Sequence, residues 1–174
     1  MNTTLSHRGP DDQGTYTDKW VSLGQRRLSI IDLSKHGKNP MTTECVHCQD
    51  RWITFNGEIY NFKELRKDLE QQGHQFFSQT DTEVVLHLYE EYGPNCLQYL
   101  NGMFAFCIYD PSKKTLFIAR DRMGIKPLYY HHKARAKPKD RQLIFSSEIK
   151  SILEHAGEEA DQIKRKICVP AMHQ

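Results

Sequence analysis

The residues whose types and spacing could do chemistry lie in the stretch Asn56-Gly57-Glu58. An amide side chain, an open backbone N–H and a carboxylate follow one another here. These are the groups that stabilise an oxyanion and hold an ammonium a few ångströms away from it. The same residues are also typical of a turn, in which Asn and Gly serve backbone geometry alone. Taken by itself, the stretch leaves a binding site and a structural turn both open.

The elements on either side of this stretch are a strand and a helix. The apolar run from 51 to 55 predicts the strand, and Phe62, Leu65 and Leu69 recur at the spacing of an apolar helix face. Asn61, with Glu64 three residues later, predicts an N-cap with its capping-box partner, and Gly73 follows the helix predicted over 62–72. We therefore expect Asn56 to Glu58 where a strand ends and a helix is about to begin.

The rest of the chain is rich in strands. Two capped helices are predicted: one after the Thr80-x-x-Glu83 capping box, stopping at Gly93-Pro94, and a short one from a Ser147 cap to about 154. Strands are predicted over 14–17, 20–23, 27–31, 104–109, 115–119, 128–131 and 143–146. Strands that outnumber helices, joined by hairpin turns, predict an α+β protein whose sheets form a sandwich covered by helices.

Seven further segments, in order, accompany the Asn-Gly-Glu stretch. They are His7-Arg8-Gly9-Pro10-Asp11, Arg27-Leu28-Ser29-Ile30-Ile31-Asp32-Leu33, Thr80-Asp81-Thr82-Glu83, Gly102-Met103-Phe104-Ala105-Phe106, Ala119-Arg120-Asp121-Arg122, Gly124-Ile125-Lys126-Pro127-Leu128-Tyr129-Tyr130 and Phe145-Ser146-Ser147-Glu148-Ile149-Lys150. Their order and spacing resemble the class II glutamine amidotransferase (glutaminase) domain of glutamine-hydrolysing asparagine synthetases. The resemblance covers residues 6–153, and residues 154–174 form an unmatched tail.

This resemblance implies both a fold and a set of roles. The fold is the four-layer αββα sandwich of the N-terminal nucleophile hydrolases, with two mostly antiparallel sheets. Asn56, through its side-chain amide, and Gly57, through its backbone N–H, would form the oxyanion hole. Arg27 would bind the carboxylate of glutamine, and Glu58 and Asp81 would surround its ammonium group.

Asp81 also has a structural interpretation. It lies in the first turn of a predicted helix, where a carboxylate interacts favourably with the helix dipole. The substrate role is favoured because two neighbouring carboxylates without a cation are costly to bury.

The family's nucleophile has no counterpart in the sequence. By resemblance it is a cysteine at the mature N-terminus, a few tens of residues before the segment of Arg8, and its own α-amine is the general base. None of the five cysteines precedes His7. The expectation is a glutaminase domain that lacks its nucleophile, its first strand and a helix, and is inactive as it stands.

Composition and the cysteine pattern bear on partners, membrane association and metal binding. The net charge of +2 argues neither for nor against a nucleic-acid partner, and none is expected. The longest apolar run is far too short for a membrane span, and the N-terminus opens no apolar stretch of the kind found in a secretory signal. Cys45-x-x-Cys48 lacks a second ligand pair, so no metal site is predicted, and Cys107 is predicted to be in the core. A cytoplasmic location is the default expectation.

Two functions remain open at this stage. One is the glutaminase domain of an asparagine synthetase that releases ammonia from glutamine. In that case its partner would be a synthetase domain, which would carry ATP and Mg, and no cofactor is expected in this chain. The other is a non-catalytic module that binds glutamine or a protein. An in-frame Met-Cys-Gly upstream of Met1 would decide for the enzyme.

Overall fold

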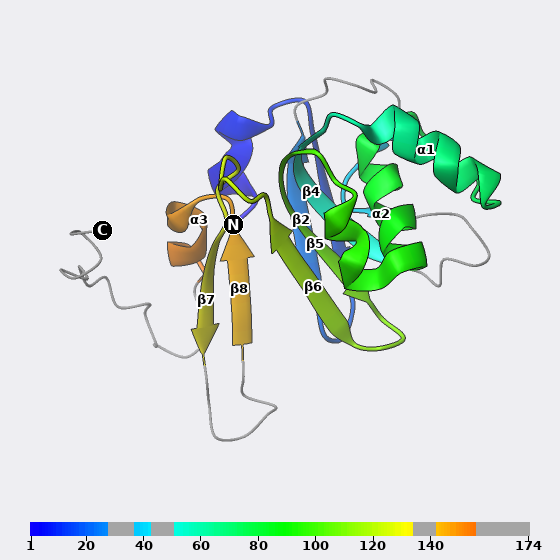
Figure 1. Cartoon of the computed structure of the whole chain (residues 1–174). Helices are drawn as coiled ribbons and strands as arrows, with labels where there is room; N and C mark the ends of the chain where they lie inside the picture. The colour runs from blue at the N-terminus through cyan, green and yellow to red at the C-terminus, as the bar shows by residue number, and fades with distance from the viewer. Residues whose placement is uncertain (28–36, 43–50, 134–141, 156–174) are drawn as a thin grey trace.

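A four-stranded antiparallel sheet lies at the centre of the computed structural model, which describes residues 1–27, 37–42, 51–133 and 142–155 (Figure 1). Its strand order is β3 (Met41–Thr42), β4 (Trp52–Ile59), β5 (Gly102–Asp110) and β6 (Thr115–Arg120). The two long strands β4 and β5 pair along the whole of β4, from Trp52↔Tyr109 to Ile59↔Gly102. A turn that begins at Asp110 joins β5 to β6.

One face of this sheet is covered by the helices α1 (Phe62–Gln71) and α2 (Asp81–Tyr92), with η3 (Gly93–Gln98) following α2. Every second residue of β4 points into this layer, so that Ile53, Phe55 and Ile59 are buried against the helices. Burial of large apolar side chains such as these contributes roughly 1.5–3 kcal/mol each. None of the helices in the described residues is long and apolar enough to cross a membrane.

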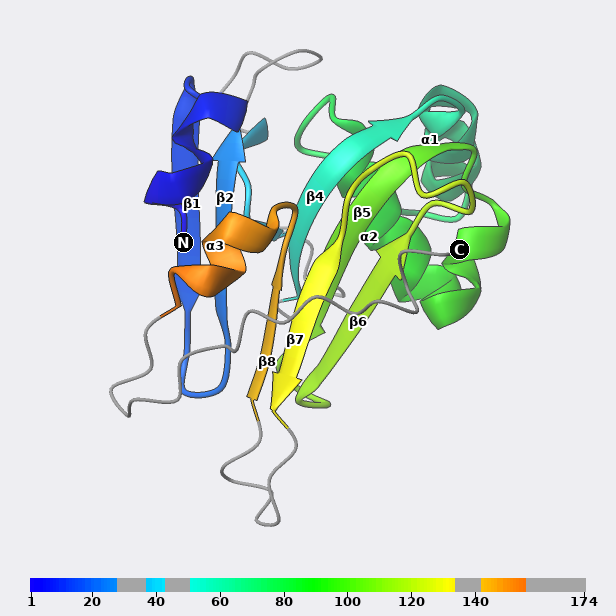
Figure 2. The same ribbon diagram turned by 90° about the vertical axis from the view of Figure 1, so that its left-hand side faces the viewer.

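Two hairpins lie on the opposite face of the sheet. They are β1 (Asp12–Thr17) with β2 (Ser22–Arg27), and β7 (Tyr129–Lys133) with β8 (Gln142–Ser146). The short helices η1 (Thr3–Arg8) and α3 (Ile149–Leu153) lie outside the hairpins (Figure 2). The layer order is therefore helix, strand, strand, helix, as predicted.

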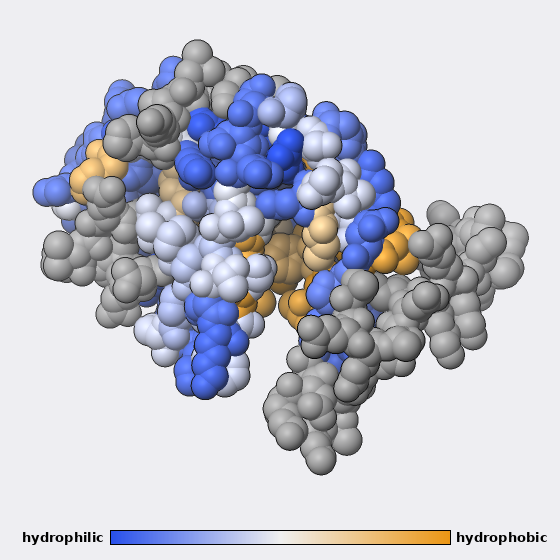
Figure 3. All heavy atoms as spheres, turned by 180° about the vertical axis from the view of Figure 1, so that it is seen from behind, coloured by the Kyte–Doolittle hydropathy of each residue, from blue (hydrophilic) through white to orange (hydrophobic). Residues whose placement is uncertain are grey.

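The strand layer formed by the hairpins is not a single sheet. The described strands of this layer form two separate two-stranded sheets, where the sequence predicted one. Seen from behind, the surface is hollowed between the hairpins, and apolar side chains gather in the hollow (Figure 3).

A second apolar cluster joins the central sheet to the β1–β2 hairpin. Leu23, Cys107 and Tyr109 are buried there, and the rings of Tyr16 and Trp52 stack with centroids 4.1 Å apart. Cys107 therefore lies in the core, which confirms the prediction made from its place on the strand.

Gln25 fastens this hairpin to the edge of β4. Its Oε1 accepts hydrogen bonds from the backbone N–H of Phe55 at 2.9 Å and from the hydroxyl of Thr54, and its Nε2 donates to the carbonyl of Phe55. Strand β3 pairs with β4 only at Trp52 and Ile53. At Phe55 the Gln25 carboxamide makes the hydrogen bonds that a longer β3 would make with the backbone of β4.

Two of the predicted helix caps are not formed, and the predicted capping box of α2 is formed only in part. Asn61 precedes α1 but makes no cap hydrogen bond, because its side chain bridges Tyr99 O and Asn101 N at 2.9 and 3.0 Å. Ser147 does not cap α3, whose N-cap position is Glu148 without a side-chain cap bond. Thr80 does cap α2 by accepting from the Glu83 N–H, but the carboxylate of Glu83 turns to the preceding loop instead of completing the box.

Some predicted strand limits also shift. The second hairpin strand begins at Ser22 rather than at residue 20, because the Asp18 carboxylate accepts from the N–H groups of Trp20 and Val21 at 2.7 and 2.8 Å. Arg27 ends this strand, and the remainder of the strand predicted over 27–31 lies outside the described residues, as do Cys45 and Cys48. The strand containing Asn56 to Glu58 continues to Ile59, so the three residues lie inside it.

The role of Gln25 gives a first prediction. Gln25→Ala leaves the N–H and C=O of Phe55 without their side-chain partners, which should cost about 1–3 kcal/mol and lower Tm by several degrees. Urea and thermal unfolding measure the loss. The control is Gln13→Ala, because Gln13 on the neighbouring strand makes only an exposed bond with Arg26. Equal stability of the two variants would show that Gln25 does not anchor the hairpin.

Candidate functional site

The candidate site occupies the edge of β4 beyond the end of β3. Along β4 the buried residues alternate with half-buried ones, and Asn56 and Glu58 belong to the half-buried set. Successive strand residues point to opposite faces. The side chains of these two residues therefore share the face of Thr54, which bonds to Gln25 of the hairpin layer. This places Asn56 and Glu58 between the two strand layers.

The side-chain amide of Asn56 is a buried donor that lacks an acceptor. Its Nδ2 atom is shielded from solvent and has no hydrogen-bond partner among the described residues. Leaving such a group unpaired costs about 1–3 kcal/mol. A fold that retains this cost has a donor ready for an oxygen atom that the described residues do not supply.

Gly57 provides a backbone donor at the same edge. The N–H groups of Phe55 and Ile59 point away from β5, since they bond to Gln25 and to Asp81 at 2.9 Å each. Strand alternation directs the N–H of Gly57, midway between them, to the same side. Glycine is required here because a Cβ would lie 2.7 Å from Phe104 Cα and against the Met103 carbonyl.

The two acidic residues of the site lie close enough to interact. The Oδ2 atom of Asp81 accepts from the backbone N–H of Ile59, which follows Glu58. Burial raises the pKa of Asp81, and the charge of Glu58 raises it further, although backbone hydrogen bonds oppose the shift. A buried carboxylate beside a second carboxylate is a place where a bound cation would be stabilised.

Arg27 reaches the same region from the end of β2. A Cβ at Gly37 would lie 3.0 Å from Arg27 Cζ and 3.3 Å from Thr80 Cγ2, so all three residues are packed together. The guanidinium group is thereby placed next to the residue that precedes Asp81. A guanidinium in this position offers the fork that binds a carboxylate bidentately.

The structure thus brings all five predicted site residues to one region, from β2, β4 and the start of α2. Two further residues that position them were missed from the sequence. Gln25 lies two residues before Arg27 and therefore on the same strand face, which is the signal that could have found it. Gly37 leaves room for the Arg27 side chain, and nothing in the local sequence indicated that contact.

Neither of the described cysteines is a nucleophile for this site. Cys96 and Cys107 are fully buried in apolar clusters. Burial raises the pKa of Cys96 to about 11 and that of Cys107 to about 12. Both thiols stay protonated at neutral pH, and a thiol attacks as its thiolate.

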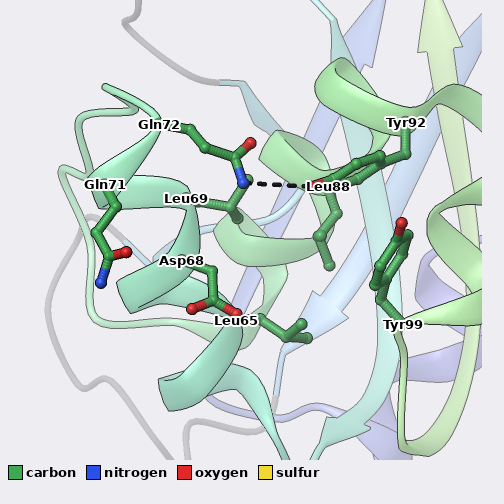
Figure 4. Close-up of a pocket in the computed structure, with 8 residues that line it drawn as sticks. All are labelled: Leu65, Asp68, Leu69, Gln71, Gln72, Leu88, Tyr92 and Tyr99. Atoms are coloured by element: carbon green, nitrogen blue, oxygen red, sulfur yellow. Dashed lines mark hydrogen bonds between the residues drawn. The ribbon is translucent and has the colours of Figure 1, made fainter.

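A surface cleft of about 440 Å³ lies elsewhere, between α1, α2 and the segment after them (Figure 4). Leucines and neutral polar groups contribute most of its lining, and Gln72 Nε2 donates to the Tyr92 hydroxyl at 3.2 Å. The lining is Leu65, Asp68, Leu69, Gln71, Gln72, Leu88, Tyr92 and Tyr99. It contains no cation for a substrate carboxylate, so we assign the chemistry to the β4 edge.

Comparison with solved structures establishes the fold class. The glutamine phosphoribosylpyrophosphate amidotransferase of B. subtilis has a TM-score of 0.56 and is 24% identical over 71% of this chain and 27% of that one. A structure of the allosteric regulatory enzyme of purine biosynthesis has a TM-score of 0.50 and is 26% identical over 63% of this chain and 25% of that one. The fold is that of the N-terminal nucleophile hydrolase type of glutamine amidotransferase.

Comparison of sequences establishes the family. The glutamine amidotransferase domain family matches residues 1–170, and the chain belongs to it. The chain is 43% identical to asparagine synthetase [glutamine-hydrolyzing] 3 of Bacillus subtilis, over 89% of this chain and 24% of that protein. It is 37% identical to asparagine synthetase [glutamine-hydrolyzing] 3 of Arabidopsis thaliana, over 99% of this chain and 27% of that protein. The chain therefore spans about a quarter of the length of these relatives.

The raised pKa of Asp81 predicts a pH-dependent stability. When the pKa of a carboxyl is higher in the folded protein than in the unfolded chain, ionisation of that carboxyl destabilises the fold. The loss of stability develops as the pH rises from the unfolded pKa to the folded pKa, and it is complete above both. Asp81→Asn keeps an oxygen for the Ile59 N–H and removes the charge. It should raise Tm at pH 8 by more than at pH 4.

The control for this experiment is Asp68→Asn on the exposed side of α1. Its Tm relative to the wild type should not depend on pH in this way. A Tm for Asp81→Asn at or below that of the wild type at pH 8 would contradict the raised pKa.

Proposed function

We propose that this site binds glutamine for hydrolysis of its side-chain amide, as the glutaminase part of a glutamine-hydrolysing asparagine synthetase. The observation that carries the proposal is the buried, unpartnered Nδ2 of Asn56 beside Gly57. Two donors that converge at one edge suit the oxygen of an amide as it becomes an oxyanion. The relatives named above are glutamine-hydrolysing enzymes, which supports the same reaction.

The arrangement of charges sets the orientation of the substrate. The α-carboxylate of glutamine would bind to Arg27, and its ammonium would bind between Glu58 and Asp81. The side-chain amide then reaches the Asn56 amide and the Gly57 N–H. Glutamine would be held at both ends, with its reactive carbonyl fixed between two donors.

The reaction also requires a thiolate. A thiolate would attack the amide carbon to give a tetrahedral oxyanion. Once a general acid has protonated the leaving nitrogen, the intermediate would collapse with release of ammonia to a thioester, which water hydrolyses to glutamate and the free thiol. The two described cysteines are excluded by burial, and the family resemblance assigns the thiol to an N-terminal cysteine. The residues of this chain would supply binding and oxyanion stabilisation.

The parent protein is the remaining part of the proposal. We infer a synthetase domain that would use ATP and Mg to activate aspartate and would consume the ammonia. A cytoplasmic location would suit this metabolism.

The binding half of the site can be tested with two ligands. Glutamine and 4-carbamoylbutyrate, which is glutamine without its α-amino group, would be titrated into the chain by calorimetry. Asp81→Asn should weaken glutamine binding roughly tenfold or more and leave the analogue nearly unchanged, because only glutamine carries the ammonium. Equal losses for both ligands would show that Asp81 does not hold the ammonium.

The carboxylate end has its own matched pair of variants. Arg27→Lys keeps the charge but loses the bidentate fork, so both ligands should bind about tenfold more weakly. Arg26→Lys, one residue earlier on the strand, should leave both affinities unchanged, since Arg26 lies on the opposite face of the strand, where its Nη1 donates to Gln13. Arg27→Lys binding as well as wild type would refute the assignment.

Hydrolysis gives a separate test. The 174-residue chain should bind glutamine without releasing ammonia at a rate typical of the family, because its described thiols are buried and protonated. Ammonia release is measured by a coupled assay. Turnover by the wild-type chain that falls about 10²–10³-fold in Asn56→Ala would show that a nucleophile is present within these residues.

A further inference from the structure

Two histidines and a glutamate meet on the outer side of α2, away from the β4 edge. His87 and Glu90 lie one turn apart on α2, and His74 comes from the loop that follows α1. His87 is six residues beyond Asp81, which is about 9 Å along the helix axis. This group is therefore distinct from the glutamine site.

The ligand atoms of this group form a nearly equilateral triangle. The distance from His74 Nδ1 to His87 Nδ1 is 3.1 Å, from His87 Nδ1 to Glu90 Oε2 3.3 Å, and from His74 Nδ1 to Glu90 Oε2 3.6 Å. Ligands at about 2.0–2.2 Å from a tetrahedral zinc ion are separated by about 3.3–3.5 Å. The triangle therefore has the size of one face of such a tetrahedron.

The two imidazole rings are also oriented toward the centre of the triangle. Their centroids lie 4.9 Å apart at an interplanar angle of 65°, whereas the Nδ1 atoms are 3.1 Å apart. The Nδ1 atoms are thus the closest part of the two rings. Two Nδ1–H groups could not face each other at that distance, so at least one Nδ1 presents a lone pair.

Each ring has a carboxylate behind its other nitrogen. Glu91 Oε2 lies 3.4 Å from His74 Nε2, and Glu83 Oε1 lies 3.8 Å from His87 Nε2. At 3.4 Å the Glu91 carboxylate can accept a hydrogen bond from His74 Nε2–H, which favours the tautomer that leaves Nδ1 of His74 to act as a ligand. At 3.8 Å Glu83 is beyond hydrogen-bond distance of His87 Nε2 and acts on that ring through its charge. Carboxylate, histidine and metal in sequence is the usual second-shell arrangement of zinc sites.

We propose that His74, His87 and Glu90 bind a zinc ion, with water as the fourth ligand. His87 is fully buried, while the side chains of His74 and Glu90 are 11% and 14% exposed, so a water molecule can reach the ion from the loop side. The ion would fasten the loop after α1 to the middle of α2. This site was not predicted from the sequence, because His74 and His87 are thirteen residues apart and lie on different elements.

A metal-free arrangement of the same residues is the alternative. Burial lowers the pKa of His87, but Glu83 and Glu90 raise it to about 9, so that without metal an imidazolium would lie between the two glutamates. In that state His74 Nδ1 would accept a hydrogen bond from the Nδ1–H of His87. The ring of Phe76 packs edge-on against the ring of His87.

The test is a zinc titration of the metal-free 174-residue chain in a Cys45→Ser, Cys48→Ser background, which removes the thiol pair as a competing site. Zinc chloride should bind with a stoichiometry of about one per chain. His74→Gln and Glu90→Gln, both at partly exposed positions, should each lower the affinity about tenfold or more. His132→Gln and Glu64→Gln, at exposed positions of β7 and α1, should leave it unchanged.

Two other measurements report on the same site. Cobalt(II) in place of zinc should give the visible bands of a tetrahedral ion without thiolate charge transfer. Zinc should raise the Tm of the parent chain and not that of His74→Gln. No zinc binding in the Cys45→Ser, Cys48→Ser background, or equal affinity in His74→Gln, Glu90→Gln and the two controls, would overturn the proposal.

Discussion

The structure depends on how the backbone groups at the free edge of β4 find hydrogen-bond partners. On one side this strand is paired with β5 throughout, while on the other its partner β3 ends after two residues. The next exposed peptide group is taken by the side chain of Gln25 and the last by Asp81. Between them Gly57 keeps an N–H directed outward. The same unfinished edge therefore docks the hairpin, docks the start of α2, and leaves a donor for a ligand.

The residues at this edge include two groups whose burial costs free energy. The buried Nδ2 of Asn56 has no acceptor among the described residues, and the carboxylate of Asp81 is buried next to Glu58. Both costs would be removed by one ligand that brings an oxygen and a cation. The surrounding framework can hold them because Glu83, behind the helix start, accepts from Phe77 N–H, Ser78 N–H and the Ser78 hydroxyl.

Much of this organisation was predictable from the sequence, for identifiable reasons. Strand alternation, the Thr80 cap and the position of Cys107 are local patterns, and each appears in the structure. The cap predicted at Asn61 failed because its amide bonds to residues forty positions away, which no local pattern reveals. For the same reason the contact of Arg27 with Gly37 and the docking of Gln25 needed the tertiary structure.

Helix α2 carries residues of both proposed sites. Its first residue, Asp81, contacts β4, and its second turn carries His87, whose ring contacts the loop residues His74 and Phe76. Glu83 lies between them and holds the backbone of that loop just before Thr80. The loop after α1 is thus fixed at both of its ends by α2. A charge or ion that tightens the contact at His74 acts on the same segment that sets the position of Asp81.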